Sequence, residues 1–122
     1  WIITEKIIEL INNEILKKNK DFIVVSVSNP IQVHPDKKII NKYKKKNNIK
    51  NINYPDNRLE FFLNKNNIKY INTAKQLSNE ALLNNTYFHG FENTKLGTGH
   101  WNKLGHSRAS KIISSQICRF YN

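Results

Sequence analysis

The sequence predicts an α/β fold in which helices cover a parallel sheet, and three observations support that prediction. Apolar residues recur at helical spacing in several segments, two short β-branched runs lie between those segments, and no internal repeat is visible. The length of 122 residues is that of one domain, and the low content of 4 Gly and 3 Pro excludes collagen-like and low-complexity classes. We therefore expect one domain over residues 1–122, of the three-layer αβα type with a parallel sheet.

The first third of the chain predicts a helix followed by a strand. Isoleucines recur every three or four positions over residues 3–19, with Lys and Glu between them, which is typical of an amphipathic helix. The run 22–28 is short, apolar and β-branched, and it fits a strand buried on both faces. Asn29 and Pro30 end this strand, because proline cannot donate to a strand ladder and restrains the residue before it.

The middle of the chain predicts three helices around a second strand. A lysine-rich helix is expected over about residues 36–48, and Pro55 opens the next helix in a position where proline is tolerated. A second short strand is expected over residues 68–72. Asn72 or Thr73 then caps a further helix.

The end of the chain predicts a last helix from about residue 103 to residue 120. Two strands alone would leave an apolar sheet edge and poorly covered helices. The chain begins at Trp1, inside a predicted helix, and contains no Met. We therefore expect further strands to lie upstream of Trp1 or to come from a partner.

The chain carries 20 Lys and Arg against 9 Asp and Glu, a formal net charge of +11. Only three of those 20 residues are arginines, and the lysines accompany many Asn and Ile residues, which share A/T-rich codons. The densest run, Lys44–Lys46, is flanked by Asn rather than by stacking aromatic residues, which favours a solvated helix face and disfavours nucleic acid as a partner. The alternative is a basic module that binds nucleic acid or another polyanion with a steep salt dependence. Its candidate residues are Lys37, Lys38, Lys42 and Lys44–Lys46.

The segment 97–106 holds the residues that best fit catalytic chemistry. His100 lies just before Asn102, the expected N-cap of the last helix. The positive end of the helix dipole favours the neutral imidazole that a general base needs. Two glycines before the histidine allow a close backbone approach, and Trp101 can anchor the loop.

This segment contains the block His100-Trp101-Asn102, followed by Gly105-His106, which is similar to the last block of the SGNH, or GDSL-type, hydrolases. The upstream elements agree in order and spacing with the C-terminal half of that family, over most of the 122 residues. They comprise the strand that ends in Ser28-Asn29-Pro30 and the Tyr54-Pro55-Asp56 sequence that opens a helix with Arg58-Leu59. The resemblance implies a flavodoxin-like SGNH fold, of which this chain is the C-terminal portion.

By this resemblance His100 is the general base that activates a serine for attack on an ester carbonyl. The family carries this serine in a Gly-Asp-Ser motif that is absent here, so the serine and the oxyanion hole are expected upstream of Trp1. Thr98 and Gly97 stand where the family has its acid. Either another group orients His100, or a Ser–His dyad operates, or the chain is a degenerate hydrolase that serves as an interaction domain. The implied substrate is a small-molecule or glycan ester.

Substrate-binding candidates follow the first strand, because ligands of open α/β sheets bind beyond the carboxyl ends of the strands. They are Asn29, Gln32 and His34, together with Trp101, which can stack on a sugar ring. In the alternative interpretation Asn29 and Gln32 satisfy loop backbone groups and His34 is solvated.

The remaining candidates favour structural roles. His106 lies inside the predicted last helix, and His89 lies in an aromatic run where a packed residue is the favoured interpretation. His100 and His106 lack zinc-site spacing and have no nearby Cys or carboxylate cluster, so we expect neither a metal nor another cofactor. Cys118, the single cysteine, is expected to be a buried, inert thiol. No apolar run reaches the roughly 18 residues of a membrane-spanning helix.

Overall fold

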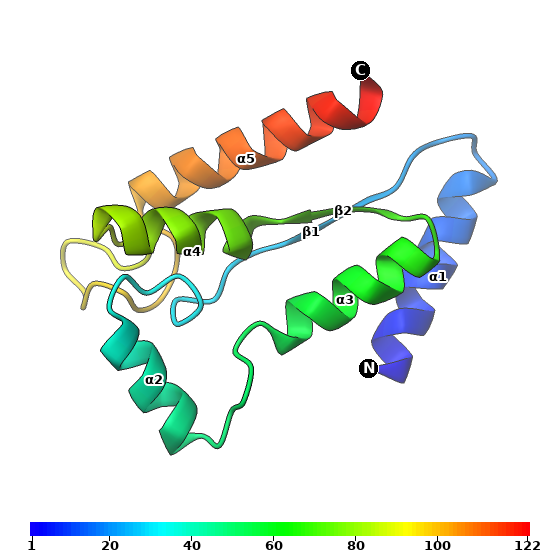
Figure 1. Ribbon diagram of the computed structural model, residues 1–122. Helices are drawn as coiled ribbons and strands as arrows, with labels where there is room; N and C mark the ends of the chain where they lie inside the picture. Colours follow the sequence, from blue (N-terminus) through cyan, green and yellow to red (C-terminus); the bar gives the residue numbers. More distant parts are fainter.

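A computed structural model describes all of residues 1–122 and contains five helices and a two-stranded parallel sheet (Figure 1). The mixed α/β class and the predicted order of elements are confirmed. The elements are α1 (Ile2–Leu16), β1 (Ile23–Ser26), α2 (Lys37–Lys46), α3 (Tyr54–Lys65), β2 (Lys69–Asn72), α4 (Thr73–Asn84) and α5 (Lys103–Tyr121).

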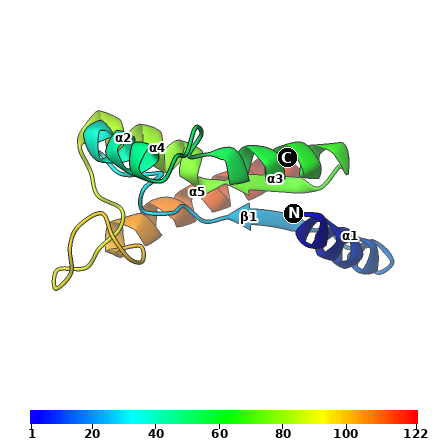
Figure 2. The same cartoon turned by 90° about the horizontal axis from the view of Figure 1, so that it is seen from below.

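The sheet consists of β1 and β2 side by side, in a register that pairs Ile23 with Lys69 and Ser26 with Asn72. Both α3 and α5 contact β2, and Figure 1 places these two helices on opposite sides of the sheet. Figure 2, turned by 90°, agrees with Figure 1 in placing α1 and α2 at opposite ends of the molecule. Helices therefore lie on both sides of β2, and the carboxyl edge of the sheet lies at the end where α2 begins.

The prediction that the first strand is buried on both faces is wrong. Val25 is 38% exposed, the other three residues of β1 are half-buried, and Val27 just beyond the strand is 66% exposed. The physical reason is that α3 and α5, on the two sides of the sheet, pack chiefly on β2 and leave the edge strand β1 partly uncovered.

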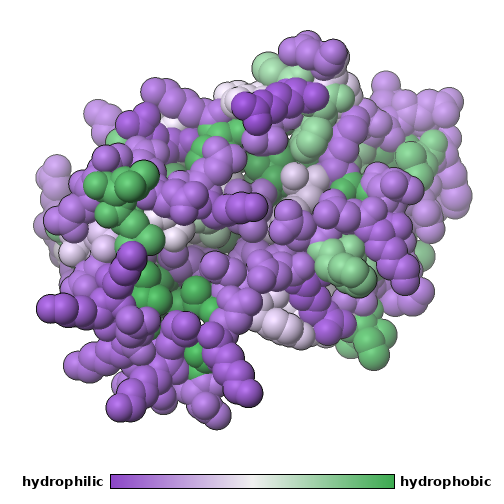
Figure 3. Space-filling model, in the orientation of Figure 1, coloured by the Kyte–Doolittle hydropathy of each residue, from purple (hydrophilic) through white to green (hydrophobic).

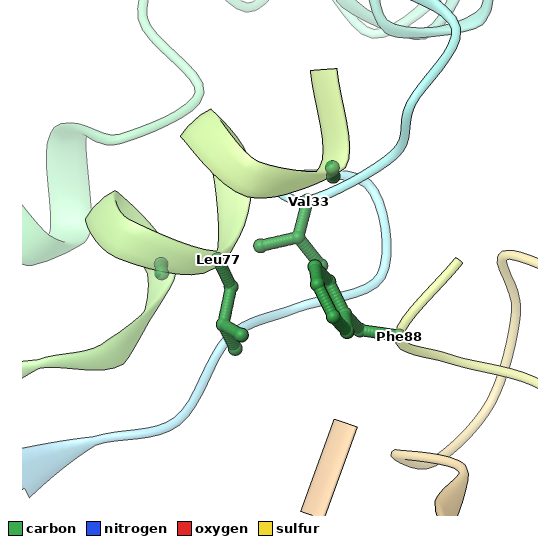
Figure 4. Packing of buried hydrophobic residues seen from close by; sticks show 5 residues of the cluster. Val33, Leu77 and Phe88 are labelled. Carbon is green, nitrogen blue, oxygen red and sulfur yellow. The ribbon is translucent and has the colours of Figure 1, made fainter. Parts of the chain in front are cut away.

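The buried apolar residues form two clusters. The first lies between α4 and the segments that follow β1 and α4, where Val33, Leu77 and Phe88 meet (Figure 4). Trp101 and Ile112 pack against this cluster from the last part of the chain. The second cluster comprises Phe62, Leu63 and Ile68 at the junction of α3 and β2. The first cluster is the one that supports the candidate catalytic segment.

Helix α1 contributes no fully buried residue. Its isoleucines Ile3 and Ile7 are 75% and 51% exposed, while Ile8 packs against the second cluster. An ion pair of 3.0 Å between Glu5 and Arg58 ties the helix to α3. Figure 3 accordingly shows separate hydrophobic groups within a largely hydrophilic surface.

Three helices, α2, α4 and α5, begin at an N-cap residue whose short polar side chain accepts a hydrogen bond from the backbone of the first turn. Asp36 accepts from the backbone of Lys38 at the start of α2, and Asn102 caps α5 as predicted. Of the two cap candidates before α4, Asn72 is the residue that caps it. Helices α1 to α4 are each followed by an asparagine with a positive φ, namely Asn19, Asn48, Asn67 and Asn85.

Candidate active site

The segment before α5 is closed by a short antiparallel bridge between His89 and Trp101. The backbone N–H of Gly90 donates to the carbonyl of His100 over 3.0 Å, and that of Asn102 donates to the carbonyl of Phe88 over 2.9 Å. Residues 100–102, at the end of the loop, are therefore fixed against residues 88–90. Of these, Phe88 is a member of the first core cluster.

The start of α5 is seated on the same residues. The side chain of Asn102 accepts from the N–H of Gly105 over 2.9 Å, and its amide group donates to the carbonyl of Tyr87 over 2.9 Å. Gly105 packs so closely that a Cβ atom there would lie 2.2 Å from the carbonyl oxygen of Phe88. The N-terminus of α5, two residues after His100, is thus fixed in place.

His100 presents an exposed imidazole that makes no hydrogen bond with any other residue of the chain. It lines an open hollow of about 450 Å³ beyond the carboxyl end of β1. Asn29 and Trp101 line the same hollow, so the structure brings three of the predicted site residues together. Ser28 and His89, which the sequence did not indicate as site residues, line it too.

Ser28 and His89, both buried, and the half-buried Trp101 form a hydrogen-bonded network at this hollow. The indole N–H of Trp101 donates to Ser28 Oγ over 2.7 Å, and Ser28 Oγ lies 3.2 Å from His89 Nε2. His89 Nδ1 lies 2.9 Å from the carbonyl oxygen of Gly99. Burial lowers the pKa of His89 below its usual value, against a smaller raising effect of the Gly99 carbonyl, and the charge of His100 adds to the lowering. His89 is therefore a packed residue, as predicted, and a neutral one.

No acidic group orients His100 in this chain. The hydroxyl of Thr98 donates to the carbonyl of Lys95 over 2.6 Å, and Gly97 approaches the ring of His34 closely. No carboxylate lines the hollow. No group of three or more His, Cys, Asp or Glu side chains in the chain is placed to hold a metal ion.

Gln32 lies beside this hollow rather than in it. It lines an adjoining, more apolar hollow of about 560 Å³, which shares Val27 and Asn29 with the first. The Gln32 side chain accepts from the N–H of Asn29 over 2.8 Å, and the Asn29 side chain accepts from the N–H of Ile31. Both side chains thus satisfy loop backbone groups, while Asn29 remains exposed to both hollows.

His34 is buried, so the interpretation of a solvated side chain is wrong. Its Nδ1 accepts from the N–H of Asp36 over 3.0 Å, and its ring packs edge-on against Tyr87. It lines neither of the two hollows and instead supports the loop at Gly97. The close contact of Gly97 matches the expected close backbone approach, whereas the expectation is wrong for Gly99, where a Cβ atom would meet no other atom within 4 Å.

Two residues of α5 complete the comparison with the sequence. His106 is exposed on the first turns of the helix, with its ring edge-on to Trp101 at 5.6 Å between centroids. Cys118 is exposed, contrary to the prediction of a buried thiol. The reason is that no residue of α5 after Ala109 is fully buried, so the last turns of the helix lie at the surface, with Tyr121 against Lys69 of β2.

The lysines of α2 lie on a mostly exposed helix, and none of them pairs with a carboxylate. No helix of the chain has both the length and the apolar character needed to cross a bilayer.

No protein-family model, no curated protein and no solved structure matches this chain. Its function is therefore inferred from its residues and their geometry.

Proposed function

We propose that this chain is the C-terminal portion of an SGNH-type ester hydrolase and that His100 is its general base. One observation carries the proposal: a hydrogen-bond-free, exposed imidazole lies beyond the carboxyl end of β1 and directly before a capped helix. This is the edge at which open α/β sheets bind their ligands. The similarity of the His100-Trp101-Asn102 block to that family supports the same assignment.

In the proposed reaction His100 removes the proton from a serine hydroxyl as the serine oxygen attacks an ester carbonyl. His100 then returns the proton to the leaving alcohol, and water releases the acyl group in a second round of the same steps. Backbone N–H groups aimed at the developing oxyanion would supply the remaining stabilisation.

The nucleophile is assigned to polypeptide outside these 122 residues. Ser28 is the only serine that lines the hollow with His100. Its oxygen is already engaged by His89 and by the indole N–H of Trp101, which withdraws electron density from it. The hollow leaves one side of His100 open for a serine from elsewhere, and the adjoining apolar hollow is available to the ester substrate, a small molecule or an acylated glycan.

The experiment that tests the proposal is fluorophosphonate labelling of the natural polypeptide that contains these residues, read by peptide mass spectrometry. The parent should carry one labelled serine outside residues 1–122, and labelling should be lost or much slowed in His100→Ala. Lys103→Ala, an exposed change on the first turn of α5, is the matched control and should label like the parent. A label on Ser28 would overturn the assignment of the nucleophile. No label on a folded protein would overturn the enzyme proposal in favour of a degenerate interaction domain.

A further inference from the structure

The residues on both sides of His100 are held at three points, although its own side chain is held at none. The carbonyl oxygen of Gly99 contacts His89 Nδ1 over 2.9 Å, and the carbonyl oxygen of His100 accepts from the N–H of Gly90. The indole of Trp101 is anchored on Ser28 over 2.7 Å. The backbone that carries the proposed base is therefore fixed while the imidazole is left free.

The direction of these hydrogen bonds can be assigned from their chemistry. The Gly99 carbonyl can only accept, so His89 Nδ1 must carry the proton. The other ring nitrogen of neutral His89 then accepts, so the Ser28 hydroxyl donates to it. Ser28 Oγ in turn accepts from the indole N–H of Trp101. The chain of donors runs in one direction from Trp101 through Ser28 and His89 to the Gly99 carbonyl.

We propose that His89 is a positioning residue for His100: its imidazole joins the Ser28 hydroxyl at the end of β1 to the Gly99 carbonyl and thereby sets the orientation of the residue that follows. This proposal rests on the proposed function of His100. A general base is usually oriented by a hydrogen bond to its own ring, as an acid does in a catalytic triad. Here no such group reaches His100, so its placement depends on the backbone on either side.

The position of the network fits this role. Ser28 is 6% exposed and His89 is 4% exposed, so water competes little for their hydrogen bonds. Phe88, next to His89, is fully buried in the first core cluster. His89 thus connects the loop of His100 to the end of β1 through Ser28, and to the first core cluster through its neighbour Phe88.

Two variants of His89 separate positioning from simple packing. In His89→Leu both hydrogen bonds are lost, whereas in His89→Asn the side-chain amide can still donate to the Gly99 carbonyl from near the position of Nδ1. Ile68→Val perturbs the second core cluster, away from the loop, and controls for a general loss of stability.

The first measurement does not depend on catalysis. In the natural polypeptide that contains these residues, NMR of the ring nitrogens of His89 should show the Nδ1–H tautomer. Amide exchange at Gly90 and Asn102, which close the bridge, should speed up at least tenfold in His89→Leu and much less in His89→Asn or Ile68→Val. The Nε2–H tautomer, or equal exchange in the two His89 variants, would overturn the proposal.

The second measurement is ester hydrolysis by the same polypeptide. His89→Leu should lower kcat by about ten- to a hundredfold with KM little changed, because a misplaced catalytic group loses rate rather than substrate affinity. His89→Asn should recover most of this loss. If His100→Ala is as active as the parent, the proposed function itself fails. If His100→Ala is inactive while His89→Leu keeps the parent's kcat, the positioning role alone fails.

Discussion

Gln32 donates its side-chain amide to Asp56 Oδ2 over 2.5 Å, across 24 residues of sequence, and both side chains are buried. The contact joins the loop after β1 to the first turn of α3. Tyr70 of β2 extends the cluster, with its hydroxyl 2.7 Å from Ser26 Oγ and 3.4 Å from Asp56 Oδ1. Burial raises the pKa of Tyr70 to about 12, so this phenol keeps its proton. The cluster therefore links both strands of the sheet to the loop after β1 and to α3.

A double-mutant cycle should reveal the strength of the contact between Gln32 and Asp56. Gln32→Leu leaves the buried carboxylate with only the long contact to Tyr70, and we expect a loss of about 1.5–3 kcal/mol in the free energy of unfolding. Combining it with Asp56→Leu should destabilise less than the sum of the two changes, by about 1 kcal/mol or more. Urea unfolding of the four proteins measures this coupling, and additive effects would show that the contact contributes nothing.

On the proposed mechanism, removal of the imidazole of His100 should slow ester hydrolysis by about 10²–10⁴-fold, the usual contribution of a general base. The change is at an exposed side chain without hydrogen bonds, so the free energy of unfolding should change by less than about 0.5 kcal/mol. Steady-state kinetics and thermal unfolding of His100→Ala, measured on one preparation, check both statements. A large loss of stability would contradict the role of a free base.

Stability should decrease in mildly acidic solution because of His89. Burial lowers its pKa in the folded chain below the usual value of 6.5. Between these two pKa values the unfolded chain binds more protons than the folded chain, so the free energy of unfolding falls as the pH falls below 6.5. His100 is the titratable group whose charge adds to this effect. Urea midpoints at about pH 7.5 and about pH 5.5 should differ more for the parent than for His89→Asn.

Gly105→Ala should displace the start of α5 because a Cβ atom would lie 2.2 Å from the carbonyl oxygen of Phe88. Helix propensity alone would favour alanine by about 1 kcal/mol, so a net loss of about 1–3 kcal/mol would be due to the clash. Ser107→Ala, on the exposed side of the same helix, is the control and should be neutral or slightly stabilising. Thermal unfolding tests this, and an alanine variant more stable than the parent would contradict the close packing.

The lysines of α2 should bind polyanions only weakly and non-specifically, because the proposed ester hydrolysis assigns them no role. Replacing Lys44, Lys45 and Lys46 by Gln removes three positive charges from a mostly exposed face without breaking an ion pair. Any polyanion binding by the parent should decline steeply with salt, and it should weaken in the variant. Fluorescence titration of the parent and the variant with a duplex oligonucleotide, at several salt concentrations, measures the affinity and its salt dependence. Tight binding that persists at high salt would favour the nucleic-acid interpretation instead.

Features that depend on neighbouring residues in the sequence could be predicted well. The N-caps Asn72 and Asn102 act within three residues of themselves, and the apolar spacing of each helix is equally local. The alternation of predicted helices with short predicted strands then indicated a parallel sheet. Local signals of this kind also placed His100 just before α5.

Features that depend on distant partners could not be predicted. The exposure of Val25 and of Cys118 depends on which elements cover them, and the sequence pattern shows only that they are apolar. Ser28 and His89 are 61 residues apart, so only the fold brings them into contact. The single available signal was the position of Ser28 at the carboxyl end of a predicted strand, where parallel sheets collect polar groups.

The asparagines with positive φ after α1 to α4 have a consequence for the composition of the chain. Left-handed backbone at a helix end is usually supplied by glycine, and asparagine is the L-residue that tolerates it best. With only 4 Gly in 122 residues, this protein ends four of its helices with asparagine in place of glycine. Replacement of Asn19, Asn48, Asn67 or Asn85 by a β-branched residue would therefore strain the backbone at a helix end. Part of the asparagine in this chain therefore has a structural role, because it ends helices in a backbone conformation that most other residues disfavour.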